Sequence, residues 1–206
     1  MIILGLTGSI GMGKSTTAEF FAELGALIWN ADDAVHRLYA KGGEAVASIA
    51  EVFPGAVIGG AVDRDMLAAL LGKDSKAFGA LEKIVHPLVA ADRANALAKA
   101  REDGVKLAVL DIPLLFETGA DAYVDAVVVA SAPPEVQTER VLKRPGMTKA
   151  RLEAILSRQL PDNEKRQRAD FIINTGKGRA RARRQVEAVV NTVLNPSWTS
   201  PRQMEQ

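Results

Sequence analysis

The chain has 206 residues, of which 48% are apolar, 25% are charged and none is cysteine, and its net charge is +1. These values fit one well-buried domain, exclude disulfides and thiolate metal sites, and do not suggest a protein that coats nucleic acid. No segment has the roughly 18 uninterrupted apolar residues of a membrane span, and the N-terminal apolar run is too short for a signal peptide. We therefore expect a cytoplasmic protein with no membrane or nucleic-acid partner.

The first residues predict a strand, a glycine-rich loop, a helix and a second strand. Residues 2–7 form a short apolar run that ends in glycine turns, as a buried strand does. Residues 15–24 carry apolar side chains at helical spacing, and Gly25 is placed to act as the C-cap. Residues 26–29 predict the second strand, which completes the strand–helix–strand unit of an α/β fold.

The next stretch, residues 33–104, is alanine-rich, helical in pattern and longer than a crossover connection needs. Only residues 56–58 suggest an extended piece. Asp63 is placed to cap one helix, and Pro87 is placed to begin another that runs to about residue 101. We interpret this stretch as an inserted substrate subdomain.

The strand pattern then resumes and gives five predicted parallel strands in all, flanked by helices. The later strands are predicted at residues 106–111, 126–130 and 171–173. Residues 134–169 are helical and basic, and nine of the 26 basic residues lie between Arg140 and Arg168. An apolar helix face ends near residue 194, and residues 195–206 are expected to be disordered.

Residues 8–15 read GSIGMGKS and fit the P-loop pattern G-x-x-x-x-G-K-[ST] at every fixed position. Glycines let consecutive N–H groups face one anion, and the helix that follows adds its positive N-terminal end. In this pattern Lys14 reaches the β- and γ-phosphates of a nucleotide, and the Ser15 hydroxyl binds Mg²⁺. A chance match is expected in roughly 1 in 100 chains of this length, and here the match lies between a predicted strand and a predicted helix.

Asp111 ends the predicted apolar strand at residues 106–111. An apolar strand that ends in an acid resembles a Walker B segment, whose carboxylate holds Mg²⁺ directly or through water. The alternative is a simple acid at the end of a strand. The pattern thus adds Asp111 to Ser15 as a candidate metal ligand.

A P-loop alone does not separate kinases from other nucleotide-binding proteins. The guanine-reading Asn/Thr-Lys-x-Asp segment of GTPases is not present. A kinase needs a group that aligns the acceptor hydroxyl and cations over the phosphates. Asp32 follows the second predicted strand and could be that carboxylate, although Asp32 or Asp33 could equally cap the next helix. Arg140 and Arg144 share a helix face that could close over ATP, with surface solubility as the alternative.

Six segments follow one another in order over residues 2–176, and Gln159, Arg166, Ala169-Asp170, Ile173-Asn174 and Gly176 continue the series. The segments are LTGSIGMGKST, NADDAVHRL, Asp63-Arg64 followed by Leu67, LEKIVHPLV, DIPLLFE and ERVLKR. Each is a weak signal alone. Together, in this order and spacing, they resemble the dephospho-CoA kinase family.

The resemblance implies that ATP phosphorylates the ribose 3′-hydroxyl of dephospho-CoA to give CoA and ADP, the last step of CoA synthesis. It implies an α/β P-loop NTPase core (residues 1–32, 105–133 and 170–194), a helical CoA subdomain (about 33–104) and a helical lid (about 134–169). The catalytic residues would be Asp32 as the base, Lys14 and Arg140, and the metal ligands would be Ser15 and Asp111. ATP would contact Gly8, Ser9, Ile10, Gly11, Met12, Gly13, Lys14, Ser15, Thr16, Arg140, Asn174 and Gly176. The acceptor would contact Asp32, Arg64, His86, Pro87, Leu114, Leu115 and Glu117.

Two departures from the family pattern stand beside the second predicted strand. Asn30 replaces a usual acid, and His36 replaces a frequent arginine, with Arg37 one place later.

Several alternatives stay open. His86 could be a capping or core histidine, the PLLF segment could be core packing, and Glu117 could be a structural acid. The chain could instead phosphorylate another small hydroxyl, or bind ATP as a regulatory module without phosphoryl transfer. The sequence does not indicate an oligomeric state.

Overall fold

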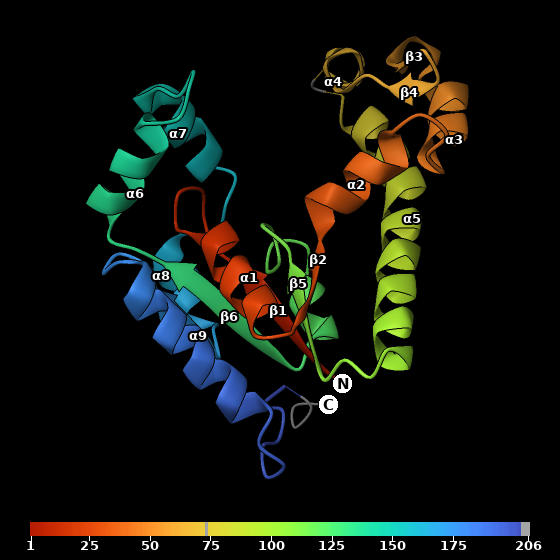
Figure 1. Cartoon of the computed structure of the whole chain (residues 1–206). Coiled ribbons are helices and arrows are strands. Elements are labelled where there is room, and N and C mark those ends of the chain that lie inside the picture. Colours follow the sequence, from red (N-terminus) through yellow and green to blue (C-terminus); the bar gives the residue numbers. More distant parts are fainter. Residues whose placement is uncertain (73, 203–206) are drawn as a thin grey trace. The chain divides into compact units, whose positions relative to one another are not determined.

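The computed structural model of the protein describes residues 1–72 and 74–202. The chain divides into two compact units (Figure 1). The larger unit consists of residues 1–29 and 100–206, and the smaller unit consists of residues 30–99. The sequence pattern had placed the inserted stretch at residues 33–104. Residues 134–169, the predicted lid, belong to the larger unit.

A five-stranded parallel sheet forms the centre of the larger unit, as the sequence predicts, in the strand order β2-β5-β1-β6-β7. Each strand is short and apolar, and the registers pair Leu6 with Asp111, Thr7 with Val129, and Ser131 with Asn174. The strands are β1 (Ile2–Thr7), β2 (Leu27–Asn30), β5 (Leu107–Asp111), β6 (Ala126–Ser131) and β7 (Phe171–Asn174).

Two helices cover one face of this sheet, α1 (Lys14–Glu23) and α9 (Arg179–Val193) (Figure 1). Apolar side chains of both helices form one core with alternate residues of the strands, among them Leu4 and Leu6. Gly25 follows the α1 C-cap, Leu24, at a φ of 84°, and its N–H donates to the carbonyl of Ala22. The cap itself is thus one residue earlier than the sequence suggested, and glycine provides the left-handed turn after it.

The basic stretch after β6 forms three helices, joined in series before the chain returns as β7. They are α6 (Pro134–Leu142), α7 (Lys149–Leu156) and α8 (Asp162–Gln167). Thr148 caps α7 by accepting the N–H of Arg151 at 3.2 Å. A short 3₁₀ helix, Ala120–Tyr123, precedes β6.

The smaller unit is mainly helical and has its own apolar core, formed by residues such as Leu38, Ile49, Leu67 and Val85. Asp63 caps α4 as predicted, because its carboxylate accepts the N–H groups of Asp65 and Met66. The helices are α2 (Ala31–Tyr39), α3 (Ala45–Val52), a 3₁₀ helix (Pro54–Ala56), α4 (Arg64–Leu71) and α5 (Ser75–Glu102).

The extended piece suggested at residues 56–58 is one half of a hairpin. Strand β3 (Val57–Ile58) pairs antiparallel with β4 (Ala61–Val62). Gly59 and Gly60 make the two-residue turn with φ values of 61° and 83°, which suit a primed hairpin turn. The two-residue β4 is too short to give a pattern in the sequence.

Pro87 does not begin a helix, so that prediction is wrong. It lies inside α5, which runs for 28 residues. A proline there removes one backbone donor and crowds the preceding turn. Side chains on both sides of it, including Leu81, Ile84, Leu88 and Val89, pack on the same apolar core. This packing keeps the helix continuous where local preference alone favours a break.

The expectation of disorder over residues 195–206 is also wrong for residues 195–202. Trp198 packs against the core of the larger unit, and the Ser200 hydroxyl donates to the carbonyl of Asp125 at 2.6 Å. Arg202 forms ion pairs with Asp170 and Asp121 at 2.6 and 3.4 Å. Residues 203–206 lie outside the described part of the chain. Along residues 1–72 and 74–202, the structure has no helix of the length and apolar character that crossing a membrane requires.

Candidate active site

The candidate site lies at the carboxyl edge of the sheet in the larger unit. Because the strands are parallel, their carboxyl ends all meet at this edge. β1 ends at Thr7 and continues into the P-loop, and the neighbouring strands end at Asp111, Ser131 and Asn174. Ligands of open α/β sheets bind at this edge.

Glycine is required in the P-loop by close packing and by backbone conformation. Gly11 and Gly13 have φ values of 78° and 86°. A Cβ on Gly11 would lie 2.6 Å from a methyl of Val141, and one on Gly13 would lie 2.9 Å from the hydroxyl oxygen of Thr175. A Cβ on Gly8 would lie 2.6 Å from a backbone carbonyl oxygen of β6. The loop therefore fits closely among the ends of β6, α6 and β7.

Lys14 begins α1, and its ammonium group contacts the Asp111 carboxylate. Asp111 is buried and the Lys14 side chain is 15% exposed, so this ion pair is largely shielded from solvent. Ser15 is exposed and Thr16 half-buried in the first turn of the same helix. The structure thus brings together Lys14 and Asp111, which the sequence assigned to a nucleotide and to its metal ion.

Two further P-loop side chains are buried. They are Ser9 and Met12, and the Met12 sulfur accepts the N–H of Ala132 at 3.1 Å. Through this contact, Met12 packs the loop against the end of β6.

Two glutamines hold the backbone of Ile10. The Gln137 side chain on α6 donates to the Ile10 carbonyl at 2.8 Å, and the Gln159 side-chain oxygen accepts the Ile10 N–H at 3.2 Å. Sequence reasoning missed the role of Gln137. A signal existed, because Gln137 stands four residues before the apolar Val141 and so shares the apolar face of α6.

Arg140 lies beside the P-loop, where the sequence expects a phosphate contact. Its guanidinium donates to the hydroxyl and carbonyl of Thr175 at 2.9 and 2.8 Å, and to the Gly11 carbonyl at 3.4 Å. The Thr175 hydroxyl in turn donates to the Met12 carbonyl at 2.7 Å. Thr175, which the sequence analysis did not select, thus joins Arg140 to the loop. By contrast, Lys143 pairs with Glu139 on the surface.

Asn174 and Gly176 shape the turn after β7. The Asn174 side-chain oxygen accepts the Gly176 N–H at 3.0 Å, and Gln185 holds the Asn174 backbone from α9 with two hydrogen bonds. A Cβ on Gly176 would lie 2.5 Å from Pro133, so only glycine fits there without rearrangement. Asn174 also lines a hollow of about 390 Å³, together with Ser131, Pro133 and Arg166.

One of the two leucines that the sequence analysis assigned to the acceptor, Leu115, is buried in the core. The side chain of Leu115 is fully buried, whereas Leu114 is 39% exposed. A fully buried side chain offers no surface to a ligand in this conformation, so Leu115 acts as core packing and only Leu114 offers a surface.

Glu117 accepts two hydrogen bonds from residues of the predicted lid, Leu160 and Lys165. The buried ammonium of Lys165 lies 2.9 Å from its Oε1 atom, and the Leu160 N–H donates to the same oxygen at 2.7 Å. Partial burial alone would raise the pKa of Glu117, but these hydrogen bonds outweigh it and hold the pKa below the usual range. Glu117 is therefore a carboxylate with structural partners.

In the smaller unit, Asp32 is exposed in the first turn of α2. Neither Asp32 nor Asp33 caps this helix, so the capping alternative is wrong. Asn30 is the N-cap, and its side-chain oxygen accepts the Asp33 N–H at 3.0 Å. The departure from the family pattern at residue 30 thus has a structural role. A contact between Asp32 and the P-loop stays a prediction.

The other residues of the smaller unit that the sequence analysis assigned to the acceptor are surface residues. His86 and Pro87 are exposed in the middle of α5, so His86 is neither a cap nor a core histidine. The Arg64 guanidinium lies 5.8 Å from the ring centre of Tyr39. Arg37 forms an ion pair with Asp92 at 2.7 Å, which explains its place on α2 without a phosphate.

Comparisons with known proteins agree on one family. A family model described as dephospho-CoA kinase matches residues 2–180. A dephospho-CoA kinase from Mesorhizobium japonicum is 56% identical over 191 residues, which cover 93% of this chain and 96% of that protein. A solved structure from Thermus thermophilus is 32% identical, covers 94% of this chain and 98% of its own, and has a TM-score of 0.84. The structure of a dephospho-CoA kinase from Campylobacter jejuni is 25% identical and has a TM-score of 0.61. The match covers 92% of this chain and 95% of that one.

The chain belongs to the dephospho-CoA kinase family. It is therefore a P-loop kinase that uses ATP, and the recognition made from the sequence is confirmed.

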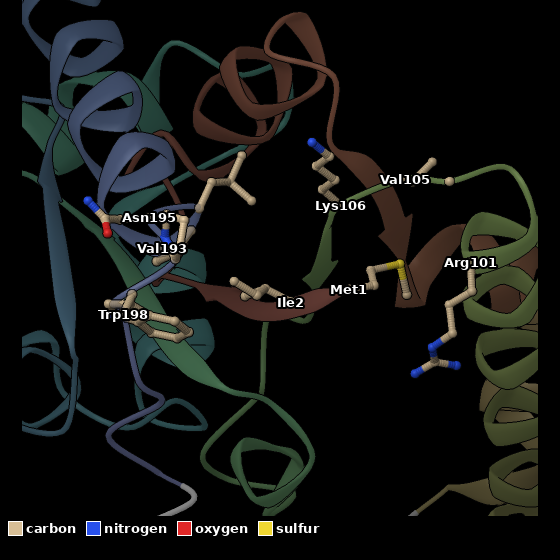
Figure 2. A pocket seen from close by; sticks show the side chains of 11 residues that line it. Met1, Ile2, Arg101, Val105, Lys106, Val193, Asn195 and Trp198 are labelled. Carbon is tan, nitrogen blue, oxygen red and sulfur yellow. The ribbon is translucent and has the colours of Figure 1, made fainter.

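A second hollow of this kinase lies at the opposite edge of the sheet (Figure 2). Its volume is about 530 Å³. Met1 and Ile2 line it at the amino end of β1, Lys106 lines it at the amino end of β5, and Trp198 lines it from the segment after α9. Figure 2 shows the Lys106 ammonium and the Arg101 guanidinium pointing away from each other. These cations do not converge on one anion, so the P-loop edge remains the candidate active site.

Proposed function

We propose that this chain transfers the γ-phosphate of ATP to the ribose 3′-hydroxyl of dephospho-CoA, which gives CoA and ADP. The observation that carries the proposal is the P-loop with its Lys14–Asp111 pair, in a chain that belongs to the dephospho-CoA kinase family. A cysteine-free composition fits the reducing cytoplasm, where we place the reaction.

The P-loop would hold the triphosphate in this reaction. Its glycines allow backbone N–H groups to approach the phosphates, and α1 begins at Lys14 with its positive end toward them. Lys14 would exchange the Asp111 carboxylate for phosphate oxygens. Thr175 holds Arg140 against the loop, and the Arg140 guanidinium would neutralise charge on the transferring phosphate.

Asp111 and Ser15 suit Mg²⁺ because both offer hard oxygen atoms. Mg²⁺ usually takes only one or two protein oxygens and completes its coordination with phosphates and water. In keeping with this, no group of three or more His, Cys, Asp or Glu side chains able to hold a metal occurs in the described parts of the chain. When bound, the ion would neutralise the β- and γ-phosphate oxygens.

Residues of the smaller unit would bind and activate the acceptor. Asp32 is exposed and would accept the proton of the 3′-hydroxyl as that oxygen attacks the γ-phosphate. The exposed His86 and Pro87 on α5, with Arg64, would bind dephospho-CoA, so the stretch at about 33–104 would be its subdomain. The exposed Leu114 of the larger unit would also bind dephospho-CoA.

A panel of acceptors tests the proposal. The purified chain is given ATP and Mg²⁺ with dephospho-CoA, shikimate or a nucleoside monophosphate, and ADP release is followed for each acceptor. We expect acceptor-dependent ADP only with dephospho-CoA, and loss of this activity in the Lys14→Ala variant, which lacks the P-loop cation. Turnover of another acceptor at a higher kcat/KM would contradict the substrate assignment, and turnover by Lys14→Ala would contradict the site.

A further inference from the structure

One charged side chain in the larger unit has no part in the proposed reaction, although it is completely buried. Lys165 on α8 has 0% of its surface exposed. Its ammonium lies 2.9 Å from the Glu117 carboxylate and donates to the Pro113 carbonyl at 3.2 Å. Burying a cation is costly, and buried ion pairs can often be replaced by apolar residues without loss of stability. Stability alone is therefore a weak explanation for Lys165.

Both partners of Lys165 lead to the P-loop. The Pro113 carbonyl also accepts the hydroxyl of Thr7 at 2.9 Å, and Thr7 is the residue directly before the loop. The Glu117 carboxylate accepts the N–H of Leu160 at 2.7 Å, and the preceding side chain, Gln159, accepts the Ile10 N–H at 3.2 Å. The two routes thus reach the loop on either side of Gly8 and Ser9.

We propose that Lys165 is a positioning residue that sets the P-loop for ATP through Glu117 and Gln159. It holds Glu117, Glu117 holds the backbone of Leu160, and this places Gln159 against Ile10. A loop fixed before the nucleotide arrives loses less conformational freedom on binding, so affinity is higher. The inference rests on the proposed function only in taking ATP as the ligand of the P-loop.

The test measures binding of a non-hydrolysable ATP analogue with Mg²⁺ by calorimetry, well below the melting temperature of each variant. Lys165→Met removes the charge and keeps an unbranched apolar chain. Gln159→Leu removes only the contact with Ile10. We expect each to weaken analogue binding by roughly tenfold. Because both substitutions act on one route, their effects should not add. We expect the double variant to bind the analogue at most about twofold more weakly than either single variant.

Arg183→Met is the matched control, because it also replaces a paired cation with methionine. Arg183 pairs with Glu23 and Glu187 on the surface of α9 and α1. We expect this variant to bind the analogue like the wild type. In turnover assays, Lys165→Met should raise the KM for ATP while the KM for dephospho-CoA stays at its wild-type value.

Wild-type analogue affinity in Lys165→Met, with only a lower melting temperature, would overturn the proposal and leave Lys165 a stabilising residue. Should Lys165→Met fail to fold, Gln159→Leu decides alone, because Gln159 is only half-buried and wild-type affinity there would equally overturn the proposal. If the wild type binds the analogue but phosphorylates no acceptor, the proposed function fails while the comparison of affinities still tests Lys165.

Discussion

At the scale of single residues, Lys14 contacts Asp111, although the proposed reaction assigns Lys14 to the phosphates of ATP and Asp111 to Mg²⁺. The pair neutralises a lysine and a buried aspartate at the edge of the sheet. In the proposed reaction, the phosphates would take the place of Asp111 beside Lys14, and Mg²⁺ would take the place of Lys14 beside Asp111. Thr175 and the two glutamines that hold Ile10 act differently, because they fix the backbone and contribute no charge.

Asp32 is the residue on which the chemical step depends in this account. In Asp32→Asn, the proton of the attacking hydroxyl has no base, so we expect kcat to fall by roughly 10²- to 10⁴-fold with ATP affinity unchanged. Steady-state kinetics and calorimetry measure the two effects. Asp33→Asn is the matched control, since Asp33 is an exposed neighbour in the same helical turn, and it should keep a near-normal kcat. Equal losses in both variants would remove the special role of Asp32.

Glu117 gives a pH-dependent contribution to stability. Because its pKa in the folded protein is below the ordinary value of 4.5, its contribution is complete above about pH 4.5 and is lost as the pH falls through the folded pKa. We expect the wild type to melt at a higher temperature than Glu117→Gln at neutral pH, and the difference to shrink below pH 4.5. A difference that stays constant with pH would show that the charge of Glu117 is not involved.

At the scale of elements, the loop between β1 and α1 needs its glycines because three neighbouring elements leave no room for a Cβ at these positions. The end of β6, the helix α6 and the turn after β7 each approach a glycine of the loop. The order of these elements in the sheet produces the fit, because β6 lies beside β1 and β7 lies beside β6.

Gly13→Ala tests this fit. The substitution forces a Cβ into a backbone with φ of 86° and against Thr175, so we expect a loss of about 1–2 kcal/mol of stability and at least tenfold weaker ATP binding. Gly25→Ala is the control, because its φ is 84° and nothing lies within 4 Å of the added Cβ. It should lose less stability than Gly13→Ala, because it adds backbone strain but no close contact, and it should keep wild-type ATP affinity. Equal stability losses and equal ATP affinities in the two variants would contradict the packing argument.

At the scale of the whole molecule, each unit has its own apolar core, and the larger unit extends its core with the last part of the described chain. Trp198, Ser200 and Arg202 fasten residues 195–202 to that unit. The polar composition and prolines of this segment suggested disorder. One half-buried tryptophan and the Arg202 ion pairs outweigh that composition.

Trp198→Ala measures how firmly the segment is held. Truncating a fully buried aromatic residue costs about 3–5 kcal/mol, so we expect about 2 kcal/mol for this half-buried one in urea unfolding. Phe78→Ala serves as a control at an aromatic residue that is 45% exposed, and it should change the free energy of unfolding by less than about 1 kcal/mol. An unchanged free energy in Trp198→Ala would mean that the segment does not pack on the core in solution.

The sequence predicted the features that depend on local residue type. The five strands, the P-loop and the Asp63 cap follow from apolar runs, fixed glycines and capping preference. Contacts between distant residues could not be predicted in this way. Lys165 meets Pro113 across 52 positions, and Gln159 meets Ile10 across 149, so no local pattern connects them. Pro87 shows the same limit, because packing on a core keeps α5 continuous through a residue that disfavours helix.

The central claim is phosphoryl transfer from ATP to dephospho-CoA. The most direct measurement is ADP release from ATP and Mg²⁺ with and without dephospho-CoA, with CoA identified by mass in the same samples. This account predicts that ADP and CoA form together in equal amounts, and that little ADP forms without the acceptor. ATP binding with no acceptor-dependent ADP and no CoA would contradict it, and would leave a P-loop protein with a different role.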